Sequence, residues 1–462
     1  MPVVLPDAST LPLRAQTGKT WGRSRDVSRR VVLSTLTLLL LCPLMVIYFW
    51  LACTHYQCSL VAPYTRLSTL FHAADPLFGP ILRSQLPQPS VEAALLFAGW
   101  LVFQGLLYAF LPGPVGQGQQ TPAGHILPYK VNGLRAWLLT HALFVAGSSL
   151  GLGWFSASII YDHWGGLLIA ANLYGYGLTA FAFSKAHLFP THAEDRKFSG
   201  SYAYDLFMGI ELNPRFGQLW DFKLFHNGRP GIIGWTLINL SFAAAQYQQL
   251  GRVTNSMVLL NFLHAVYVVD FFYHEDWYLR TIDIAHDHFG FYLAWGDSVW
   301  LPFMYTLQSH FLVRHPIDLP WLVATGLLAM GLVGYYIFRH ANNQKDLTRK
   351  ADGKLNIWGR PAQVIRAAYS TSDGKQHTSI LLTSGFWGIS RHFNYVGDLL
   401  MCFAFCAACG FDYLLPHFYF IYMTILLVHR IQRDGARCTA KYGPYWDEYC
   451  RRVPYKLIPY IY

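Results

Sequence analysis

A run of charged and aromatic side chains near the C-terminus has the spacing to bind a multiply charged anion. On a helix its members fall on two adjacent stripes, the first formed by Arg430, Asp434, Cys438 and Tyr442, the second by Arg433, Arg437 and Lys441. The cations would bind phosphates, and the carboxylate and phenol could hydrogen-bond sugar hydroxyls or an amide. The alternative is a positively charged segment beside a membrane, which many membrane proteins carry.

A second stretch with residues that could do chemistry covers 267–297. It is mostly apolar and aromatic yet includes six carboxylates and three histidines. Acids at membrane depth are costly, so they normally face a cavity, where they do chemistry or bind a ligand. The alternative is a polar network between helices with an interfacial loop, which we expect for Asp270 and Asp276. Gly290 and Gly296 interrupt the stretch, and this favours a broken or re-entrant segment that lines a pocket.

The same stretch contains two histidines on either side of an acid, His286, Asp287 and His288. Adjacent positions diverge on a helix, so this trio is a poor match to the geometry that zinc or iron demands. We therefore predict no metal site.

Two further basic-polar clusters are expected on the same membrane face as the C-terminal stripes. Lys345 and Arg349 lie four residues apart at the end of an apolar run, and residues 391–395 precede another. A dinucleotide phosphate could bridge the three clusters. No GxGxxG motif follows a predicted strand, so any nucleotide would be held by helix ends and side chains rather than by a Rossmann fold.

The composition indicates which elements position these groups. Of 462 residues, 53% are hydrophobic and only 13% are charged, whereas a soluble domain carries about 25% charged residues. The apolar stretches are continuous rather than alternating, which predicts an all-α, polytopic membrane protein and not a β-barrel. Ten membrane spans are predicted, at 31–53, 93–111, 136–155, 164–183, 232–247, 257–273, 298–312, 321–338, 395–409 and 413–428.

The net charge of +10 is concentrated in residues 1–30, 339–375 and 430–462. With ten spans, all three segments fall on one side, and the positive-inside rule makes that side the cytosol, together with both termini. Nucleic acid is the rival partner for a basic chain. We exclude it because the charge lies beside spans and not on a separable domain.

The remaining segments are expected to be connections. Residues 1–30 are predicted to be a disordered cytosolic tail, and 31–462 a single membrane domain. Residues 54–90 and 184–231 are predicted to be loops. Asp-Gly pairs at 352–353 and 373–374 predict one or two small cytosolic hairpins within 351–380. A disulfide between Cys53 and Cys58 is an open possibility.

Several long motifs resemble the sterol reductase family, and the resemblance covers nearly the whole chain from Trp21 onward. The signature-like segments are GIELNPRFG (209–217) and LVHRIQRDGARCTAKYGPYWDEY (427–449). Others, including DFKLFHNGRPGI (221–232) and RHFNYVGDL (391–399), are most similar to the branch that reduces the double bond between carbons 7 and 8 of 7-dehydrocholesterol. The hairpin insertion at 351–380 favours the same branch.

The resemblance implies an endoplasmic reticulum enzyme that reduces 7-dehydrocholesterol to cholesterol with NADPH. The cofactor pocket would face the cytosol within about 267–462, and a sterol isomerase of the same pathway is an implied partner besides sterol and membrane lipid. By motif position, the implied cofactor contacts are Lys345, Arg349, Leu382, Trp387, His392, Asn394, Tyr395, Arg430, Asp434, Cys438, Lys441, Tyr442 and Tyr449. Lys345 and Arg349 would bind phosphate, in our interpretation the 2′-phosphate.

Such a reaction needs an acid, because an isolated olefin is a poor hydride acceptor until it is protonated. Burial in an apolar sterol pocket raises a carboxyl pKa and keeps the group protonated at neutral pH. A tyrosine can relay the proton if a carboxylate resupplies it. We expect Tyr267 to be the proximal donor, and the carboxylates that could stand behind it are Glu275, Asp283, Asp287 and Asp297.

Three alternatives remain open from the sequence. A sterol C-14 reductase would apply the same chemistry to a different double bond. A non-enzymatic sterol-binding scaffold would keep the fold but not the cofactor clusters. A prenyl-cysteine-type methyltransferase would have similar C-terminal helices, but it would be shorter and would not need Lys345 and Arg349 for a 2′-phosphate.

Overall fold

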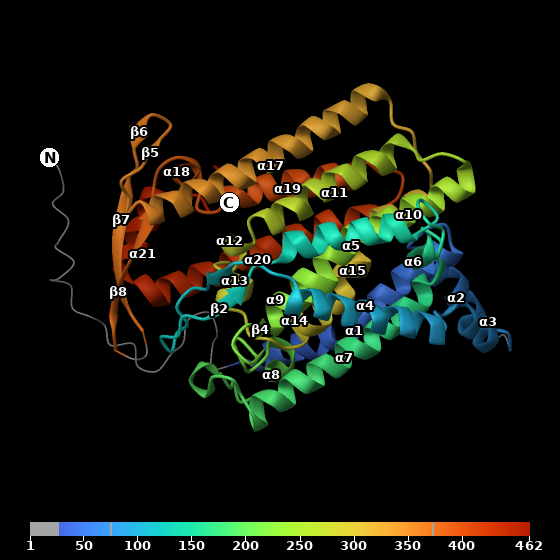
Figure 1. Cartoon of the computed structure of the whole chain (residues 1–462), viewed down its shortest axis with the longest axis horizontal. Coiled ribbons are helices and arrows are strands. Elements are labelled where there is room, and N and C mark those ends of the chain that lie inside the picture. The colour runs from blue at the N-terminus through green and yellow to red at the C-terminus, as the bar shows by residue number, and fades with distance from the viewer. Residues whose placement is uncertain (1–26, 74–75, 372–373) are drawn as a thin grey trace.

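The computed structural model describes residues 27–73, 76–371 and 374–462, so the predicted disordered tail, 1–30, lies almost wholly outside the described residues. Long helices run side by side along the longest axis of the molecule (Figure 1). A paired hairpin and the last helix lie at one end, and two short helices that follow the first span lie at the opposite end (Figure 1).

Five of the described helices are long and apolar enough to cross a membrane: α1 (Arg29–His55), α4 (Val91–Phe110), α7 (Trp164–Leu188), α11 (Asn255–Tyr273) and α17 (Trp321–Lys350). Four of them contain a predicted span, and α4 covers all but the last residue of the span 93–111. Side chains of Ser28, Ser90 and Thr254 accept hydrogen bonds from the first-turn N–H groups of α1, α4 and α11, which fixes where these helices begin. The chain is therefore a mostly helical protein with several candidate membrane-spanning helices.

Four other predicted spans overlap single helices, namely α5 (Gly133–Gly147), α10 (Gly234–Leu250), α19 (Phe393–Ala407) and α20 (Phe418–Tyr442). The span 136–155 extends beyond the end of α5, and α20 continues well past 413–428. The interval 298–312 is different, because it is divided among the π-helix η3 (Gly296–Trp300), α15 (Leu301–Met304) and α16 (Leu307–Arg314). The prediction of one continuous helix there is wrong. The prediction of a broken segment around Gly296 is confirmed.

Two predicted loops contain regular structure. Residues 54–90 form α2 (Ala62–His72) and α3 (Phe78–Gln85), and a disulfide joins Cys53 to Cys58 at the end of α1. Residues 184–231 include short elements that the sequence pattern did not indicate: η1 (Ala193–Asp195), α8 (Tyr202–Met208), β3 (Arg215–Phe216), β4 (Trp220–Asp221), α9 (Phe222–His226) and most of the π-helix η2 (Asn227–Ile233).

Residues 351–380 contribute two antiparallel hairpins, as predicted. The first pairs β5 (Asn356–Ile357) with β6 (Arg360–Pro361), and its turn is Trp358–Gly359, where both φ angles are positive at 51° and 78°. The Asp352–Gly353 pair lies between α17 and β5, so the prediction that it forms a hairpin turn is wrong. The second hairpin pairs β7 (Val364–Ser370) with β8 (Gln376–Leu382). Of the turn predicted at 373–374, Asp373 lies outside the described residues.

The remaining elements are short connectors around this bundle: β1 (Val115–Gln117), β2 (Pro128–Lys130), α6 (Ile159–Asp162), α12 (Glu275–Tyr278), α13 (Ile282–Ala285), α14 (Phe291–Trp295), α18 (Phe386–Ile389), η4 (Leu415–His417) and α21 (Pro444–Arg452). β1 and β2 pair as an antiparallel ribbon.

Two close packings place the helices that surround the site. α17 crosses α19 where Gly334 and Gly397 meet, and a Cβ atom on either glycine would lie 2.5–2.6 Å from the other's carbonyl oxygen. The two π-helices also pack together, and the side chain of Asn227 in η2 donates a 3.0 Å hydrogen bond to Asp297 in η3. π-Helical turns inside α-helices often mark functional sites.

Candidate active site

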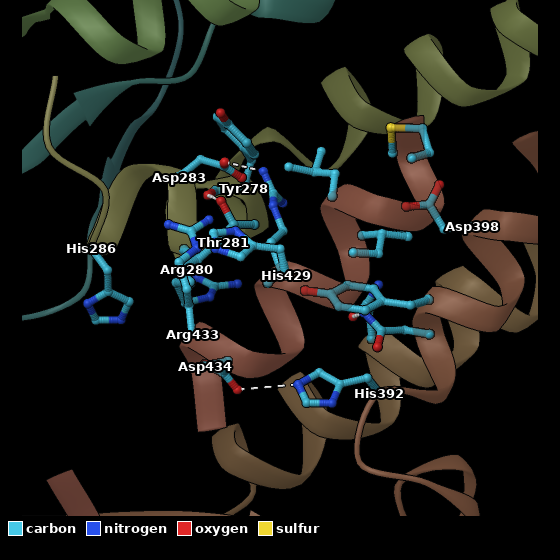
Figure 2. A pocket seen from close by; sticks show the side chains of 18 of the residues that line it. Tyr278, Arg280, Thr281, Asp283, His286, His392, Asp398, His429, Arg433 and Asp434 are labelled. Atoms are coloured by element: carbon cyan, nitrogen blue, oxygen red, sulfur yellow. Dashed lines mark hydrogen bonds and ion pairs between the residues drawn. The ribbon is translucent and has the colours of Figure 1, made fainter. Parts of the chain in front are cut away.

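One large cavity, with a volume of about 1110 Å³, joins most of the predicted site residues. Its walls come from α11, α17, α19 and α20, from the π-helices η2 and η3, and from strands β7 and β8. Figure 2 shows a view into it, with Asp283 and His286 on one side and His392 and Asp398 on the other. The cavity therefore lies where the C-terminal helices meet the segment 267–300.

A cluster of four cations lines the hairpin end of the cavity: Lys345, Arg349, Arg437 and Lys441. The Lys345 ammonium lies 3.9 Å from the centroid of the Trp387 ring, and Arg349 donates from Nε to the carbonyl of Ile380 at 3.2 Å. Among the described residues, no carboxylate lies within ion-pair distance of Lys345 or Arg349. The cluster has the excess positive charge that an anion would neutralise.

Asp434 is the carboxylate at the centre of this cluster. Arg437 donates to it from Nε at 3.1 Å, and His392 lies 3.4 Å away on the opposite side, as the dashed line in Figure 2 marks. Burial opposes its ionisation, but Arg437 and then His392 outweigh burial and keep the pKa of Asp434 well below its usual range. An ionised Asp434 thus fixes the two side chains beside it.

The same surroundings disfavour the charged form of Lys441, whereas they favour the charged form of Asp434. Burial, and next the repulsion from Arg437, lower its pKa to about 7. Its neighbour Cys438 is buried, and this burial raises the pKa of the thiol to about 12. Cys438 is therefore a neutral packing and contact group, whereas Lys441 can change its charge near neutral pH.

Arg430 and Arg433, which lie earlier on α20, have carboxylate partners and do not belong to the cation cluster. Arg430 forms an ion pair with Asp283, and Arg433 donates to Asp287 at 2.9 Å. We expected both stripes to bind phosphate, but these two guanidinium groups attach α20 to α13 and to the residues that follow it. Only the last turn of α20, with Arg437 and Lys441, belongs to the cation cluster.

His286 completes this contact between the loop and α20. Burial, followed by Arg437 and Lys441, lowers its pKa well below the usual range, so its ring is neutral. The ring nitrogen Nε2 can then accept the 3.0 Å hydrogen bond from Arg437. The loop thus carries three side chains that each face one arginine of α20.

The middle of the cavity holds amide and phenol groups with unused hydrogen-bonding capacity. Asn394 donates to Asn342 at 3.2 Å, yet its own Oδ1 and the Nδ2 of Asn342 are buried without a partner among the described residues. Tyr395 lines the same region. Unsatisfied buried polar atoms are costly, so a ligand that bonds to them would be favoured here.

The deep part of the cavity is apolar and aromatic, with Trp235, Trp295, Trp300, Tyr305, Phe418 and Tyr422 in its walls. Two carboxyls lie in these walls without a cation within ion-pair distance among the described residues. Asp297 accepts from Asn227 through one oxygen while its Oδ2 is buried and unpartnered, and Asp398 has Cys402 Sγ 3.9 Å from its Oδ1. Tyr267 lines the same chamber.

The structure thus brings together most of the residues selected from the sequence. All thirteen expected cofactor contacts line this cavity, as do Tyr267, Asp283 and Asp297. Glu275 and Asp287 do not line it. Glu275 is fully buried, binds Arg229 at 2.5 Å and accepts from the backbone N–H of Gly133, and so it joins α12 to η2 and α5.

Sequence reasoning missed Asp398 as a candidate acid. The signal was present, because Asp398 interrupts the apolar run 395–409, where a carboxylate is costly. Asp270, assigned instead to a polar network, forms one: it pairs with Arg339 and accepts from the Tyr335 hydroxyl at 2.9 Å. These bonds join α11 to α17.

Comparisons with known proteins agree with this arrangement. Residues 27–462 match the model of the "Ergosterol biosynthesis ERG4/ERG24 family". The chain is 51% identical over 451 residues to a 7-dehydrocholesterol reductase of Xenopus laevis, covering 95% of this chain and 94% of that protein. The same enzyme of Danio rerio is 51% identical over 453 residues, covering 96% and 94%.

A Delta(14)-sterol reductase of Methylotuvimicrobium alcaliphilum is less similar, at 41% identity over 434 residues, or 93% of this chain and 95% of that protein. The matches extend through the cation cluster and the apolar chamber alike. The family expected from the motifs is therefore confirmed, and the chain belongs to the ERG4/ERG24 family of sterol reductases.

Proposed function

We propose that this protein reduces the carbon 7–8 double bond of 7-dehydrocholesterol to give cholesterol, with NADPH as the reductant. The observation that carries the proposal is one continuous cavity that connects a cation cluster to an aromatic chamber containing carboxyls without cationic partners. The two vertebrate relatives at 51% identity bear the name of this activity.

The residues of the cavity fit a phosphorylated dinucleotide. The cluster of Lys345, Arg349 and Lys441 would hold the 2′-phosphate, and Asn394 and Asn342 offer unpartnered polar atoms to an amide. His392, Tyr395, Asp434 and Tyr449 line the wall between these regions and would hydrogen-bond the sugars. Bound NADPH would supply the hydride that completes the reduction.

The chain's own part of the chemistry is the proton. We propose that Tyr267 delivers it to the olefin and that Asp398, which lines the same cavity, resupplies it. Asp297 is the second candidate acid. Asp283 is paired with Arg430, so it would orient the wall.

Protonation of the olefin leaves a tertiary carbocation on the sterol until the hydride arrives. The faces of Trp295, Trp300 and Tyr305 surround the deep chamber and would stabilise this charge. The same apolar walls exclude water, which would otherwise trap the cation as an alcohol.

We further propose an endoplasmic reticulum membrane protein with ten spans and with both termini and the two hairpins in the cytosol. The five long apolar helices and the overlap of four further helices with predicted spans support this topology. NADPH would then enter from the hairpin end, and the sterol from the bilayer.

A sterol C-14 reductase is the second candidate, because Delta(14)-sterol reductases match at 41% and 38% identity. The cavity offers the same acid and cation cluster to either double bond. Higher identity to the 7-dehydrocholesterol reductases favours the first.

The decisive experiment incubates purified protein in lipid nanodiscs with 7-dehydrocholesterol and either NADPH or NADH, and follows loss of the conjugated-diene absorbance. Turnover with NADPH that falls in Arg349→Ala toward the NADH rate would support both the reaction and the phosphate contact. Arg366→Ala is the matched control, because Arg366 is exposed on β7 and binds Asp352 away from the cavity. NADPH binding without turnover of 7-dehydrocholesterol would instead favour the second candidate, a sterol C-14 reductase.

A further inference from the structure

Lys223 is a buried cation that the proposed chemistry does not use. It lies on α9, its side chain is about 1% exposed, and its ammonium donates three hydrogen bonds to backbone carbonyls. These carbonyls belong to Asp283 (3.0 Å), Ile284 (2.6 Å) and Asp287 (2.7 Å). All three N–H donors of the ammonium are therefore used on one short loop.

The loop has a reason to need this cation. α13 is only four residues long, Ile282–Ala285, so most of its carbonyls have no partner within the helix. The Lys223 ammonium lies where these carbonyls converge and complements their negative ends. Asn213 also donates to the Ile284 carbonyl at 3.2 Å, but it is uncharged.

The opposite side of the same loop carries the side chains that face α20. Asp283 pairs with Arg430, Asp287 with Arg433, and His286 accepts from Arg437. Asp283 and His286 line the cavity, and Figure 2 shows both on its wall. The backbone carbonyls of this segment thus bind one cation, Lys223, and its side chains bind three arginines of α20.

Asp221 fixes the start of α9, the helix that carries Lys223. It caps α9 by accepting from the Leu224 N–H at 2.9 Å, and it lies 3.3 Å from the Arg215 guanidinium. Because α9 is anchored in this way, the position of the Lys223 ammonium is set by a rigid element and not by the loop that it binds.

We propose that Lys223 is a positioning residue for the cavity. By binding the three backbone carbonyls, its ammonium sets the positions of Asp283 and His286. Through the contacts of these side chains with Arg430 and Arg437, it also sets the register of α20 against the proposed cofactor region. This role deepens the proposed reductase activity and rests on it. Lys223 does not touch the cavity itself, since it lies behind the loop.

The test replaces Lys223 with Met, which keeps the length of the stem and removes the donors. Displacement of catalytic groups by about 1 Å can cost 100-fold in rate, so we expect kcat to fall 10- to 100-fold and the NADPH dissociation constant to rise a few-fold. Amide hydrogen exchange across residues 282–289 should become faster, and exchange in α7 should stay unchanged. Lys223→Gln, which retains two donors, should lie between Met and wild type.

A double-mutant cycle separates positioning from general stability. In an Asp283→Asn background, Lys223→Met should change kcat less than about twofold if it acts through Asp283. Lys185→Met is the matched control, because it also removes a buried ammonium, bound there to Glu211 at 2.9 Å and away from the cavity. It should lower the melting temperature without altering exchange at residues 282–287. Phe289 is left out of this comparison because its N–H donates to the Glu211 carbonyl at 3.0 Å.

Unchanged exchange and kcat in folded Lys223→Met would overturn the proposal. An equal loss of kcat in both backgrounds, or recovery of only unfolded protein from both Lys223 variants, would also overturn it in favour of a purely structural role. Exchange needs no turnover. A wild-type protein inactive on 7-dehydrocholesterol would therefore refute the proposed function while leaving the loop measurement decisive for Lys223.

Discussion

The carboxyls considered as proton donors differ in what surrounds them. Asp283 and Asp287 have arginine partners, whereas Asp297 and Asp398 have none within ion-pair distance among the described residues. A carboxyl in an apolar wall without a cation favours its protonated form. We therefore propose the second pair as the source of the proton.

Asp398→Asn is expected to lower kcat by about 100-fold or more, because general acid catalysis contributes about 10²- to 10⁴-fold. The NADPH dissociation constant should stay within twofold of wild type, as measured by fluorescence titration. Asp412→Asn is the control, since Asp412 is exposed beyond the end of α19. Full activity in Asp398→Asn, with loss in Asp297→Asn, would assign the proton to Asp297.

Lys441 predicts a pH dependence of cofactor affinity. Its pKa of about 7 makes it cationic below that pH and neutral above, so affinity for NADPH should weaken as pH rises from 6.5 to 8.5. The second phosphate pKa, near 6, lies below this window. Lys441→Arg keeps its charge throughout and should reduce the pH dependence in titration calorimetry. The remaining dependence is expected from Lys345 in the same cluster, because burial lowers its pKa to about 7 as well. An unchanged curve in the variant would assign the dependence to another group.

At the scale of elements, α20 joins the two halves of the site. One face of this single helix holds α13 and the residues that follow it through Arg430 and Arg433, and its last turn carries Arg437 and Lys441 into the cation cluster. The cation cluster and the cavity wall that carries Asp283 are thus fixed relative to one another by one helix. The four-residue spacing read from the sequence places charged side chains in both parts, but their partners differ.

A second element contact holds the other end of that loop. Gly209 has a φ of +83°, and a Cβ there would lie 2.4 Å from the backbone of Phe289. Gly209→Ala is expected to destabilise the protein by about 3 kcal/mol or more, because both the backbone conformation and the close approach forbid a side chain.

Thermal unfolding followed by size-exclusion chromatography in detergent measures this effect. Gly177→Ala in α7, where a Cβ would meet nothing within 4 Å, should leave the melting temperature unchanged. Equal melting temperatures for the two alanine variants would show that the Gly209 contact is not required.

At the scale of the whole molecule, the disulfide and the hairpins lie at opposite ends of the bundle (Figure 1). The Cys53–Cys58 disulfide at the end of α1 suits an oxidising lumen. A glycosylation acceptor on a flexible spacer inserted between Leu86 and Ser90 should therefore be glycosylated in microsomes. The same insertion at the Trp358–Gly359 turn should not. An endoglycosidase-sensitive mass shift at the hairpin would reverse the proposed topology.

The sequence by itself determined the properties that depend on neighbouring residues. Runs of about 20 apolar residues indicate spans because that length crosses a bilayer, and the four-residue spacing of charges on one helix requires no knowledge of its partners. The long motifs identified the family. All thirteen cofactor contacts that the family resemblance implied by motif position line one cavity.

The tertiary structure alone decided which charge meets which. Arg430 and Asp283 are 147 positions apart in the chain, and Glu275 faces Arg229 instead of the cavity, so no local pattern distinguishes a paired carboxyl from a proton donor. The π-helices at 227–233 and 296–300 likewise arise where two broken helices pack together. The pairing of charged side chains and the breaks in helices depend on contacts between residues far apart in the chain. Composition and local spacing do not indicate these contacts.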